Sequence, residues 1–405
     1  GPRPPRLGAG GASMKVVFLT DSLSDLDGVG RYSVRLISAL EELRPDLEVH
    51  VLLARKHRPT SADVPSHWRV EVALPPDYFF YMTRSRFRIW RWIGTWRTRR
   101  ALRGAALVHA IKDYPHSLIG VDAADRAGIP CVATGHGTYT IQPVKADGPH
   151  RERALDAYSR FAAMISVSRY TRRRLLEIVP ARTLPPERVH VVPNAVSAAH
   201  YAEPRALEGV QWAGMRFTLG IGEVKERKGH HLAVAAWAKA ARTRPDLHHV
   251  LVGNKTGDAY ERSLVELARA EGVEDRLHLV GNIEEVEKVD LLQRAEVFLH
   301  TPVTAADGGF EGFGIVYLEA AAAGTPSIGS LDSGAEDAIV DGETGLLVDQ
   351  DVDGVGAALV SLLDDPDRRA RLAEGGLAHA ARSSWTDNAR DVLSIYDSVL
   401  GGSQG

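Results

Sequence analysis

The sequence predicts an α/β protein made of two doubly wound, Rossmann-like domains that face each other across a cleft. A chain of 405 residues exceeds one ordinary hydrophobic core, which favours two domains of roughly 200 residues each. Short apolar, β-branched runs alternate with segments of helical spacing along the whole chain. Most of these runs are continuously apolar, as expected for parallel strands that helices cover on both faces.

The first domain is expected over residues 14–200. Apolar runs that predict strands alternate there with helical segments such as 29–43. The expected strands are 15–19, 49–53, 107–111, 131–134, 164–167 and 189–192. Residues 1–13 are rich in glycine and proline, so they are expected to form a disordered tail.

The second domain is expected over residues 210–384, after a stretch at 194–209 with little periodicity. Its expected strands are 217–221, 249–252, 277–280, 297–300, 327–328 and 345–348, with helical spacing at 231–241, 260–270 and 285–294. The last segment, 385–405, is expected to form a helix that returns to pack on the first domain. Ligands of such folds bind at the carboxyl ends of the strands, here in the cleft between the domains.

Composition excludes several classes of protein. The formal net charge of −3 does not suit a general polyanion binder, and no nucleic-acid motif is present. The single cysteine, Cys131, rules out an internal disulfide framework and a cysteine zinc site. No apolar run approaches the length of a membrane span, and the N-terminus lacks the apolar region of a secretory signal. A cytoplasmic location is therefore expected; the oligomeric state stays open.

The most informative segment is 309–329, which reads G-F-E-G-F-G-I-V-Y-L-E-A-A-A-A-G-T-P-S-I-G. If a helix begins near Gly314, Glu311 precedes it and Glu319 lies just over one turn into it, so both carboxylates can face one cavity. The free N–H groups of a helix N-terminus suit a phosphate or a polar sugar. A carboxylate accepts hydrogen bonds from the vicinal hydroxyls of ribose or hexose. The plainer alternative is a helix entry preceded by an acidic loop.

Two loops of the first domain also fall at expected strand ends. Gly28 and Gly30, in the segment D-L-D-G-V-G-R, could cradle a phosphate at the start of a helix. The third glycine of the dinucleotide fingerprint is missing, so NAD is not expected. His136, in T-G-H-G-T, could donate a hydrogen bond to a sugar hydroxyl or to developing charge. The alternative is a purely structural histidine.

In the second domain, the loop 220–231 reads G-I-G-E-V-K-E-R-K-G-H-H. Its cations beside a glycine-rich turn match a diphosphate, whose charge grows as it leaves. The residues of interest are Gly222, Lys225, Arg227 and Lys228. A solvated basic turn, partly neutralised by its own glutamates, is the alternative. The sequence has no H-E-x-x-H, G-x-S-x-G or G-K-[ST] motif, and a required metal site is not expected.

A different feature is segment 78–112, which contains no Asp or Glu. Arginines alternate there with aromatic residues, and Ile89, Trp92, Ile93 and Trp96 would share one face of a helix. A basic-aromatic amphipathic helix suits an anionic membrane surface or an anionic acceptor. The alternative is a core or dimer helix with an arginine-rich solvent face. The residues singled out for membrane or acceptor binding are Arg88, Arg91, Trp92 and Trp96.

Taken as an ordered set, these motifs resemble the retaining, GT-B-fold glycosyltransferases of family four (glycosyl transferases group 1). The resemblance runs from about residue 14 to 400, nearly the whole chain. Its most specific part is F-E-G-F-G-I-V-Y-L-E-A-A-A-A-G-T-P, which is similar to the E-x7-E signature of that family. H-G at 136–137, V-S-R-Y-T at 167–171, V-P-N-A-V at 192–196 and R-K-G at 227–229 accompany it.

The resemblance implies a role for each site residue. Glu311 would contact the transferred sugar, His136 would approach that sugar from the first domain, and Lys228 would neutralise the diphosphate. Glu319 would hold the ribose hydroxyls. Glu223 stands where many relatives carry an arginine, so Lys225 or Arg227 is expected to supply a second cation. The other residues implied in donor binding are Gly28, Gly30, Gly222, Asn282 and Ile283 beside the base, and the backbone amides of Phe313, Gly314 and Ile315.

The expected activity is transfer of a hexosyl unit from a UDP- or GDP-sugar to a hydroxyl, with retention of anomeric configuration and no required cofactor. The first domain would bind the acceptor and the second the nucleotide-sugar. The acceptor is expected to be a membrane-associated lipid or glycan, with the protein peripheral on the inner face of the membrane, or else a small soluble sugar or metabolite. A nucleotide-sugar 2-epimerase and a non-catalytic sugar-nucleotide sensor are the alternatives from other classes.

Overall fold

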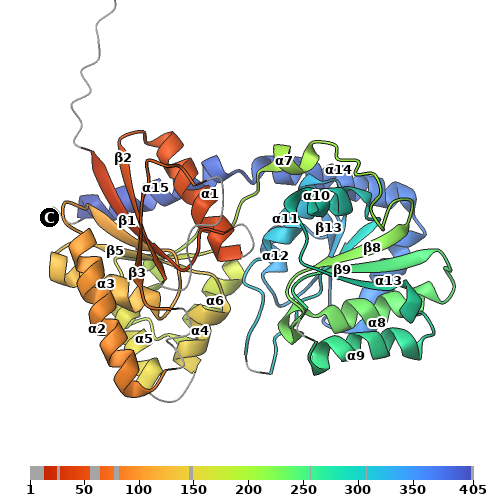
Figure 1. Cartoon of the computed structure of the whole chain (residues 1–405), viewed down its shortest axis with the longest axis horizontal. Coiled ribbons are helices and arrows are strands. Elements are labelled where there is room, and N and C mark those ends of the chain that lie inside the picture. The colour runs from red at the N-terminus through yellow and green to blue at the C-terminus, as the bar shows by residue number, and fades with distance from the viewer. Residues whose placement is uncertain are drawn as a thin grey trace, which may run out of the picture.

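The computed structural model of the chain describes residues 13–24, 28–54, 64–76, 82–145, 149–255, 257–306 and 308–402 (Figure 1). These residues form two lobes, each built on a parallel sheet with helices on both faces. The sheets have seven and six strands. This arrangement confirms the predicted fold class. Residues 1–12 of the expected tail lie outside the described residues.

The first sheet has the strand order β3-β2-β1-β4-β5-β6-β7. Neighbouring strands pair in parallel throughout, with β1 lying between β2 and β4. Its strands are β1 (Met14–Thr20), β2 (Leu47–Ala54), β3 (Arg69–Leu74), β4 (Leu107–Ala110), β5 (Cys131–Gly135), β6 (Ala163–Ser166) and β7 (Val189–Val191). Its helices are α1 (Gly28–Leu43), α2 (Arg84–Ala101), α3 (His116–Ala127), α4 (Thr138–Lys145), α5 (Pro149–Arg160) and α6 (Arg169–Ile178).

The second sheet has the order β10-β9-β8-β11-β12-β13. Here β8 lies between β9 and β11, which repeats the arrangement of the first sheet. The strands are β8 (Arg216–Ile221), β9 (Leu247–Val252), β10 (Leu277–Gly281), β11 (Val297–Leu299), β12 (Ser327–Ser330) and β13 (Gly345–Val348). The helices are α7 (Ala198–Ala202), α8 (His230–Ala241), α9 (Ala259–Ala270), α10 (Glu285–Arg294), α11 (Ile315–Ala322), α12 (Ala335–Ala338), α13 (Val352–Leu363) and α14 (Pro366–Arg382). The last helix, α15 (Trp385–Gly401), belongs to the first lobe.

The continuous apolar runs reflect burial on both faces of each sheet. On β1, Val16 and Phe18 face one hydrophobic cluster while Val17 and Leu19 face another, and none of the four is exposed to solvent. The sequence analysis did not predict β3, whose residues R-V-E-V-A-L alternate polar and apolar and are buried only at the carboxyl end. This strand lies at the edge of the sheet, where one neighbour is missing and polar side chains are tolerated.

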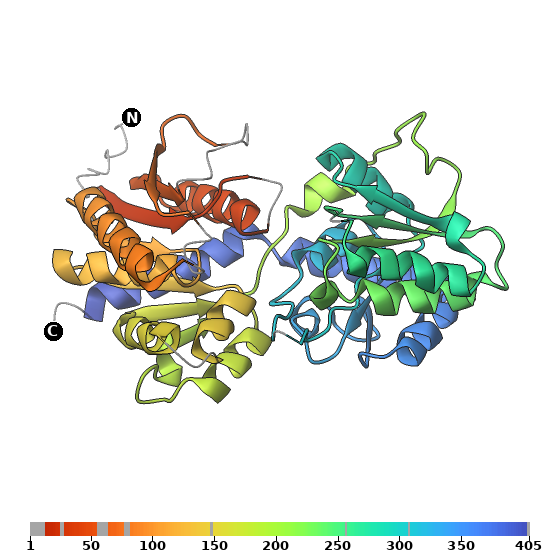
Figure 2. The same ribbon diagram turned by 60° about the horizontal axis from the view of Figure 1, so that its bottom comes forward.

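The chain crosses between the lobes twice, and the two crossings lie side by side. Val196 N donates to Ser383 O at 2.9 Å, and Asn388 Nδ2 donates to Pro193 O at 2.6 Å. Beyond the second crossing, α15 packs on α1 of the first lobe, and both views show it there (Figures 1 and 2). Between the crossings, α7 packs on α11 and α14 of the second lobe, so the chain leaves the first lobe before α7.

Candidate active site

The two lobes touch through the loop that precedes α11. The Cβ of any larger residue at Gly312 would lie 1.8 Å from the carbonyl oxygen of His136, so only glycine fits there. Ser168 Oγ donates to Gly312 O at 2.6 Å. Thr138 Oγ1 donates to Phe310 O and accepts from Phe310 N, both at 3.1 Å. The structure therefore brings the predicted loops 134–138 and 309–314 together at the carboxyl ends of both sheets.

The start of α11 is fixed by glycine. Gly314, the N-cap of α11, has φ +82°, and a Cβ there would lie 2.7 Å from the ring of Tyr317. Among the residues that the structure describes, no side chain caps this helix end, so the first amides of α11 can serve a ligand. Tyr317 Oη donates to His300 O at 2.5 Å, which ties the first turn of α11 to the end of β11.

Glu311 lies beside this helix start and forms an ion pair with Lys228. His300 Nε2 lies 3.3 Å from the same carboxylate oxygen, Oε2, and His300 is fully buried. Burial alone would raise the pKa of Glu311, but Lys228 and the His300 hydrogen bond hold it well below its usual value. Burial lowers the pKa of Lys228, and Glu311 partly offsets this effect. The pair is therefore an ionised pair in a largely closed space.

Local backbone geometry places Lys228 beside Glu311. It ends a short 3-10 turn, Glu226–Lys228, directly before α8. The next residue, Gly229, has φ +66°, and a Cβ there would lie 1.6 Å from Thr301 O. Gly222 lies under the Lys228 side chain, since its Cβ would lie 3.5 Å from Cδ of that lysine. The predicted residues Gly222 and Lys228 are thus brought together.

The other two cations of this loop point elsewhere. Lys225 Nζ lies 3.2 Å from Glu223 Oε1, and Arg227 Nη2 lies 3.4 Å from Glu223 Oε2. Burial would raise the pKa of Glu223, but Lys225 and Arg227 lower it below its usual value. Within the described residues, neither cation forms an ion pair with Glu311 or Glu319. Their role toward a diphosphate stays a prediction.

Glu319, one turn into α11, is 1% exposed and holds two cations. Arg31 Nη1 lies 2.5 Å from Oε1, and Lys288 Nζ lies 3.1 Å from Oε2. Burial would raise the pKa of Glu319, but Lys288 and Arg31 bring it to about 2. Lys288 also contacts Tyr201 Oη at 3.0 Å and Glu285 Oε2 at 2.9 Å.

The sequence analysis missed both of these cations. Arg31 directly follows Gly30 in the predicted phosphate-binding segment D-L-D-G-V-G-R, and this position could have indicated a role in the site. Lys288 lies in α10, three residues after Glu285, in a pattern that surface helices commonly show. Asn282 and Ile283 link β10 to α10, with Asn282 exposed and Ile283 partly buried. They therefore lie on the segment that leads into the Glu319 cluster.

The remaining predicted donor residues occupy helix starts. Gly28 and Gly30 lie in the first turn of α1, with Gly28 exposed and Gly30 buried. Residues 25–27 of that loop lie outside the described residues. Phe313 buries its side chain while its backbone precedes Gly314, and Ile315 is the first residue of α11. The backbone amides named in the sequence analysis are thus grouped at one helix end.

His136 is held by its own lobe. Its Nε2 lies 2.9 Å from the carbonyl oxygen of Ile111, which can only accept, so Nε2 carries the proton. Burial lowers the pKa of His136, with Asp113 acting in the opposite direction, so the ring is neutral at pH 7. In this geometry the carbonyl of Ile111 takes the Nε2 proton, which leaves Nδ1 as an acceptor. The contact of this ring with a sugar stays a prediction.

The residues predicted for membrane or acceptor binding lie on α2, away from the second lobe (Figures 1 and 2). Trp92 is 66% exposed and Trp96 49% exposed, and Arg88 is exposed as well. Arg91 is different: it pairs with Asp122 of α3 through Nε at 2.6 Å and Nη2 at 2.9 Å. Arg91 therefore fastens α2 to α3, and its role toward a membrane or an acceptor stays a prediction.

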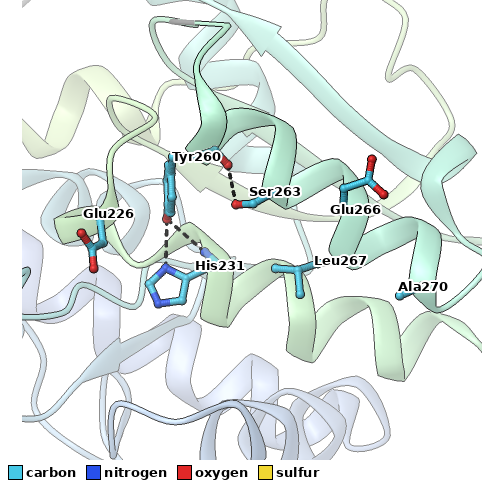
Figure 3. A pocket seen from close by; sticks show the side chains of 7 residues that line it. All are labelled: Glu226, His231, Tyr260, Ser263, Glu266, Leu267 and Ala270. Carbon is cyan, nitrogen blue, oxygen red and sulfur yellow. Dashed lines mark hydrogen bonds between the residues drawn. The ribbon is translucent and has the colours of Figure 1, made fainter.

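A pocket of about 600 Å³ opens elsewhere, between α8 and α9 (Figure 3). Tyr260 Oη bonds to His231 Nδ1 at 3.0 Å and accepts from His231 N at 3.2 Å. Two residues that line the pocket, Glu226 and Glu266, are acidic, and none of the lining residues is lysine or arginine. This charge disfavours a diphosphate, which favours the lobe interface at α11 as the candidate site. The pocket between α8 and α9 is lined by Glu226, His231, Tyr260, Ser263, Glu266, Leu267 and Ala270.

Two family models match this chain. The model described as "Glycosyltransferase Family 4" covers residues 26–200, and the model described as "Glycosyl transferases group 1" covers residues 213–379. The gap between the two matches, at residues 201–212, lies shortly after the first crossing between the lobes.

Curated relatives give the same family. A D-inositol 3-phosphate glycosyltransferase of Thermobispora bispora is 31% identical over 304 residues, covering 70% of this chain and 68% of the relative. A phosphatidyl-myo-inositol mannosyltransferase of Mycolicibacterium smegmatis is 30% identical over 212 residues, or 52% of each chain. The chain therefore spans about half to two thirds of the length of these relatives.

Solved structures share the fold. HepE of Anabaena, in complex with UDP and glucose, has a TM-score of 0.75 at 18% identity, covering 95% of this chain and all of that one. The sucrose-phosphate synthase of Thermosynechococcus elongatus has a TM-score of 0.74 at 20% identity, covering 96% of this chain and all of that one. At this level of identity the likeness concerns the fold.

Proposed function

Because the chain belongs to the group 1 glycosyltransferases of family four, we propose that it transfers a hexosyl unit from a nucleotide-diphosphate sugar to a hydroxyl, with retention. One observation carries this proposal. Two buried carboxylates line α11, each paired with a lysine: Glu311 with Lys228 at the helix start, and Glu319 with Lys288 one turn further on. This spacing suits a ligand that has an anionic centre between two sets of hydroxyls.

In this proposal the donor lies along α11. The ribose hydroxyls donate to Glu319, and the diphosphate meets the free amides of α11 and the Lys228 ammonium. The transferred sugar lies toward Glu311, between this loop and His136 of the other lobe. His136 Nδ1 accepts from a sugar hydroxyl, in the neutral form that burial favours. UDP and GDP are both considered. HepE forms a complex with UDP, and a relative in Corynebacterium glutamicum is a GDP-mannose-dependent mannosyltransferase.

The reaction needs no protein nucleophile in this proposal. The bond between the anomeric carbon and the phosphate oxygen breaks while the acceptor oxygen bonds to the anomeric carbon on the same face. The acceptor's proton passes to the departing phosphate oxygen. Lys228 and the α11 amides stabilise the growing negative charge, so no metal is required. Contact between the lobes at Gly312 restricts water and thereby limits donor hydrolysis.

The first experiment is a thermal-shift screen of the full chain with UDP-, GDP- and ADP-sugars, because a ligand that binds only the folded state raises the melting temperature. One donor class is expected to stand out. NMR of the product should then show the anomeric configuration of the donor. Release of an altered free sugar without any acceptor would instead support the epimerase. Binding without any turnover would support the sensor.

We further propose that the acceptor lies on an anionic membrane, to which α2 docks. Ile89, Trp92 and Trp96 are 56%, 66% and 49% exposed along this helix, and several arginines around them are exposed too. Aromatic side chains at the headgroup level and basic residues are what such a surface attracts, at about 1 kcal/mol per basic residue. Among the described residues, no helix has the length and apolar character to cross a bilayer. Association would therefore be peripheral.

Sedimentation with vesicles tests this second proposal. The protein should bind vesicles rich in phosphatidylserine but not purely zwitterionic ones, and a Trp92→Ala/Trp96→Ala variant should bind several-fold more weakly. A matched control is Leu377→Ser, which removes another exposed apolar side chain, 43% exposed, on α14. Because α2 lies away from the cleft, transfer to a soluble acceptor should be unchanged. Absence of vesicle binding at low salt would leave the soluble acceptor as the alternative.

A further inference from the structure

Arg31 reaches from the first lobe to the carboxylate that the proposed function assigns to ribose. It lies in the first turn of α1, and its guanidinium Nη1 is 2.5 Å from Glu319 Oε1 on α11. Its Nη2 is 3.9 Å from Glu285 Oε2 on α10. The Arg31 side chain is 21% exposed, whereas Glu319 is 1% exposed. Arg31 therefore reaches a buried carboxylate of the opposite lobe.

A second cation, shared with Glu285, also pairs with Glu319 from within its own lobe. Lys288 of the same lobe already lies 3.1 Å from its other oxygen, and the Lys288 side chain is 8% exposed. Lys288 is further fixed by Tyr201 Oη at 3.0 Å and Glu285 Oε2 at 2.9 Å. One cation is thus built into the second lobe, while the other arrives from across the cleft. Arg31 is the more exposed of the two cations, at 21% against 8% for Lys288.

The position of Arg31 matches the middle of the proposed donor. Glu319 lies five residues after Gly314, which places it about 7 Å along the helix axis from the free amides of α11. A ribose held at Glu319 and a diphosphate held at those amides must be joined beside this stretch of α11. A guanidinium on Glu319 Oε1 therefore lies at the junction of ribose and diphosphate.

The second lobe supplies little free positive charge for that diphosphate. Lys225 and Arg227 both lie on Glu223, at 3.2 and 3.4 Å, and Lys228 lies on Glu311. Counting these five side chains gives three cations and two carboxylates, a net charge of +1. A nucleotide diphosphate brings at least two negative charges, so a cation from the first lobe would complete the balance.

We propose that Arg31 is a donor-binding residue that occupies the ribose carboxylate in the empty cleft and moves to the diphosphate when the donor enters. The ribose hydroxyls then take its place on Glu319. This inference rests on the proposed function, since it assumes that a nucleotide lies along α11. It explains why an arginine, with several donors in a planar fork, stands at the first turn of α1: the same group suits a carboxylate and a phosphate.

Calorimetric titration of the full chain with paired probes tests this exchange. The probes are uridine and UDP, and guanosine and GDP, compared between wild type and Arg31→Ala. UDP or GDP should bind on the order of 10- to 100-fold more weakly to the variant, because a charged hydrogen bond is lost. The nucleoside, which lacks phosphate, should bind equally well or more tightly, because its competitor for Glu319 is gone. Arg31→Lys should give an intermediate affinity for the diphosphate.

Arg169→Ala is the matched control. Arg169 also joins the lobes, through Asp337 at 2.8 Å, but its side chain is 77% exposed and it contacts neither Glu319 nor Glu285 in the described residues. This variant should change the nucleoside and the diphosphate affinities by the same factor. If Arg31→Ala did likewise, or changed neither affinity, the exchange would be overturned while the proposed function stood. If no nucleotide bound the wild type, the proposed function itself would fail and this inference with it.

Discussion

Replacing Lys228 with methionine separates the stability of the site from its chemistry. The Lys228 and Glu311 side chains are only 16% and 11% exposed, so the variant leaves a nearly buried carboxylate with His300 as its remaining close partner. Breaking a buried pair from one side costs about 3–5 kcal/mol. For a lobe of this size, the melting temperature should then fall by roughly 6–20 °C.

The same variant should also lose the cation that faces the leaving diphosphate. Removal of one such donor typically lowers kcat by a factor on the order of 100 to 1000. The double variant Lys228→Met/Glu311→Gln removes both charges, so most of the lost stability should return while activity does not. Differential scanning calorimetry and a steady-state transfer assay at saturating donor measure the two effects separately.

Lys239→Met provides the matched control. Lys239 pairs with Asp353 at 3.2 Å, but the side chains are 54% and 93% exposed, so its loss should cost no more than about 1 kcal/mol and leave activity intact. Two results would refute the reasoning: turnover of Lys228→Met at the wild-type rate with saturating donor, or a double variant no more stable than the single one.

Two further predictions follow from the same site. Gly312→Ala should strongly lower the transfer rate, because the added Cβ would lie 1.8 Å from His136 O and separate the lobes. Nucleotide affinity should stay within a few fold of the wild-type value. An unchanged transfer rate would contradict this assignment. Burial lowers the pKa of Lys228, so kcat/KM should fall as pH rises through a value below that of an ordinary lysine, about 10.4. Lys228→Arg keeps its charge and should extend activity to higher pH, and a pH profile identical to that of the wild type would argue against Lys228 as the titrating group.

The strands and the α11 site were predictable because the residues that specify each of them lie close together in the sequence. A strand such as β1 is apolar along its whole length, and Gly314 and Glu319 belong to one helix, whose geometry fixes their spacing. The pairing of Arg31 with Glu319 was not predictable, since these residues are 288 positions apart in sequence. No periodicity encodes which cation reaches a given carboxylate across a domain interface.

The orientation of individual side chains could not be predicted from the sequence either. The donor of His136 is taken by the carbonyl of Ile111, 25 positions earlier, which only the tertiary fold positions. On α2, the apolar stripe was identified, but a stripe of that kind is usually buried. The helix instead packs through Phe87 and through its small residues. Gly94 approaches Ile119 so closely that a Cβ would lie 2.8 Å from Cδ1. This close approach leaves the tryptophans outside.

The return of α15 to the first lobe has a consequence for how the protein assembles during synthesis. Val392 and Tyr396 of α15 are fully buried in that lobe, and Tyr396 bonds to His109 at 2.6 Å. The second lobe needs only residues that are contiguous in the chain, whereas the first needs a helix made after nearly everything else. The rest of the first lobe therefore leaves the ribosome before α15 is made. We expect the second lobe to complete its fold first, although domains usually fold in order from the N-terminus.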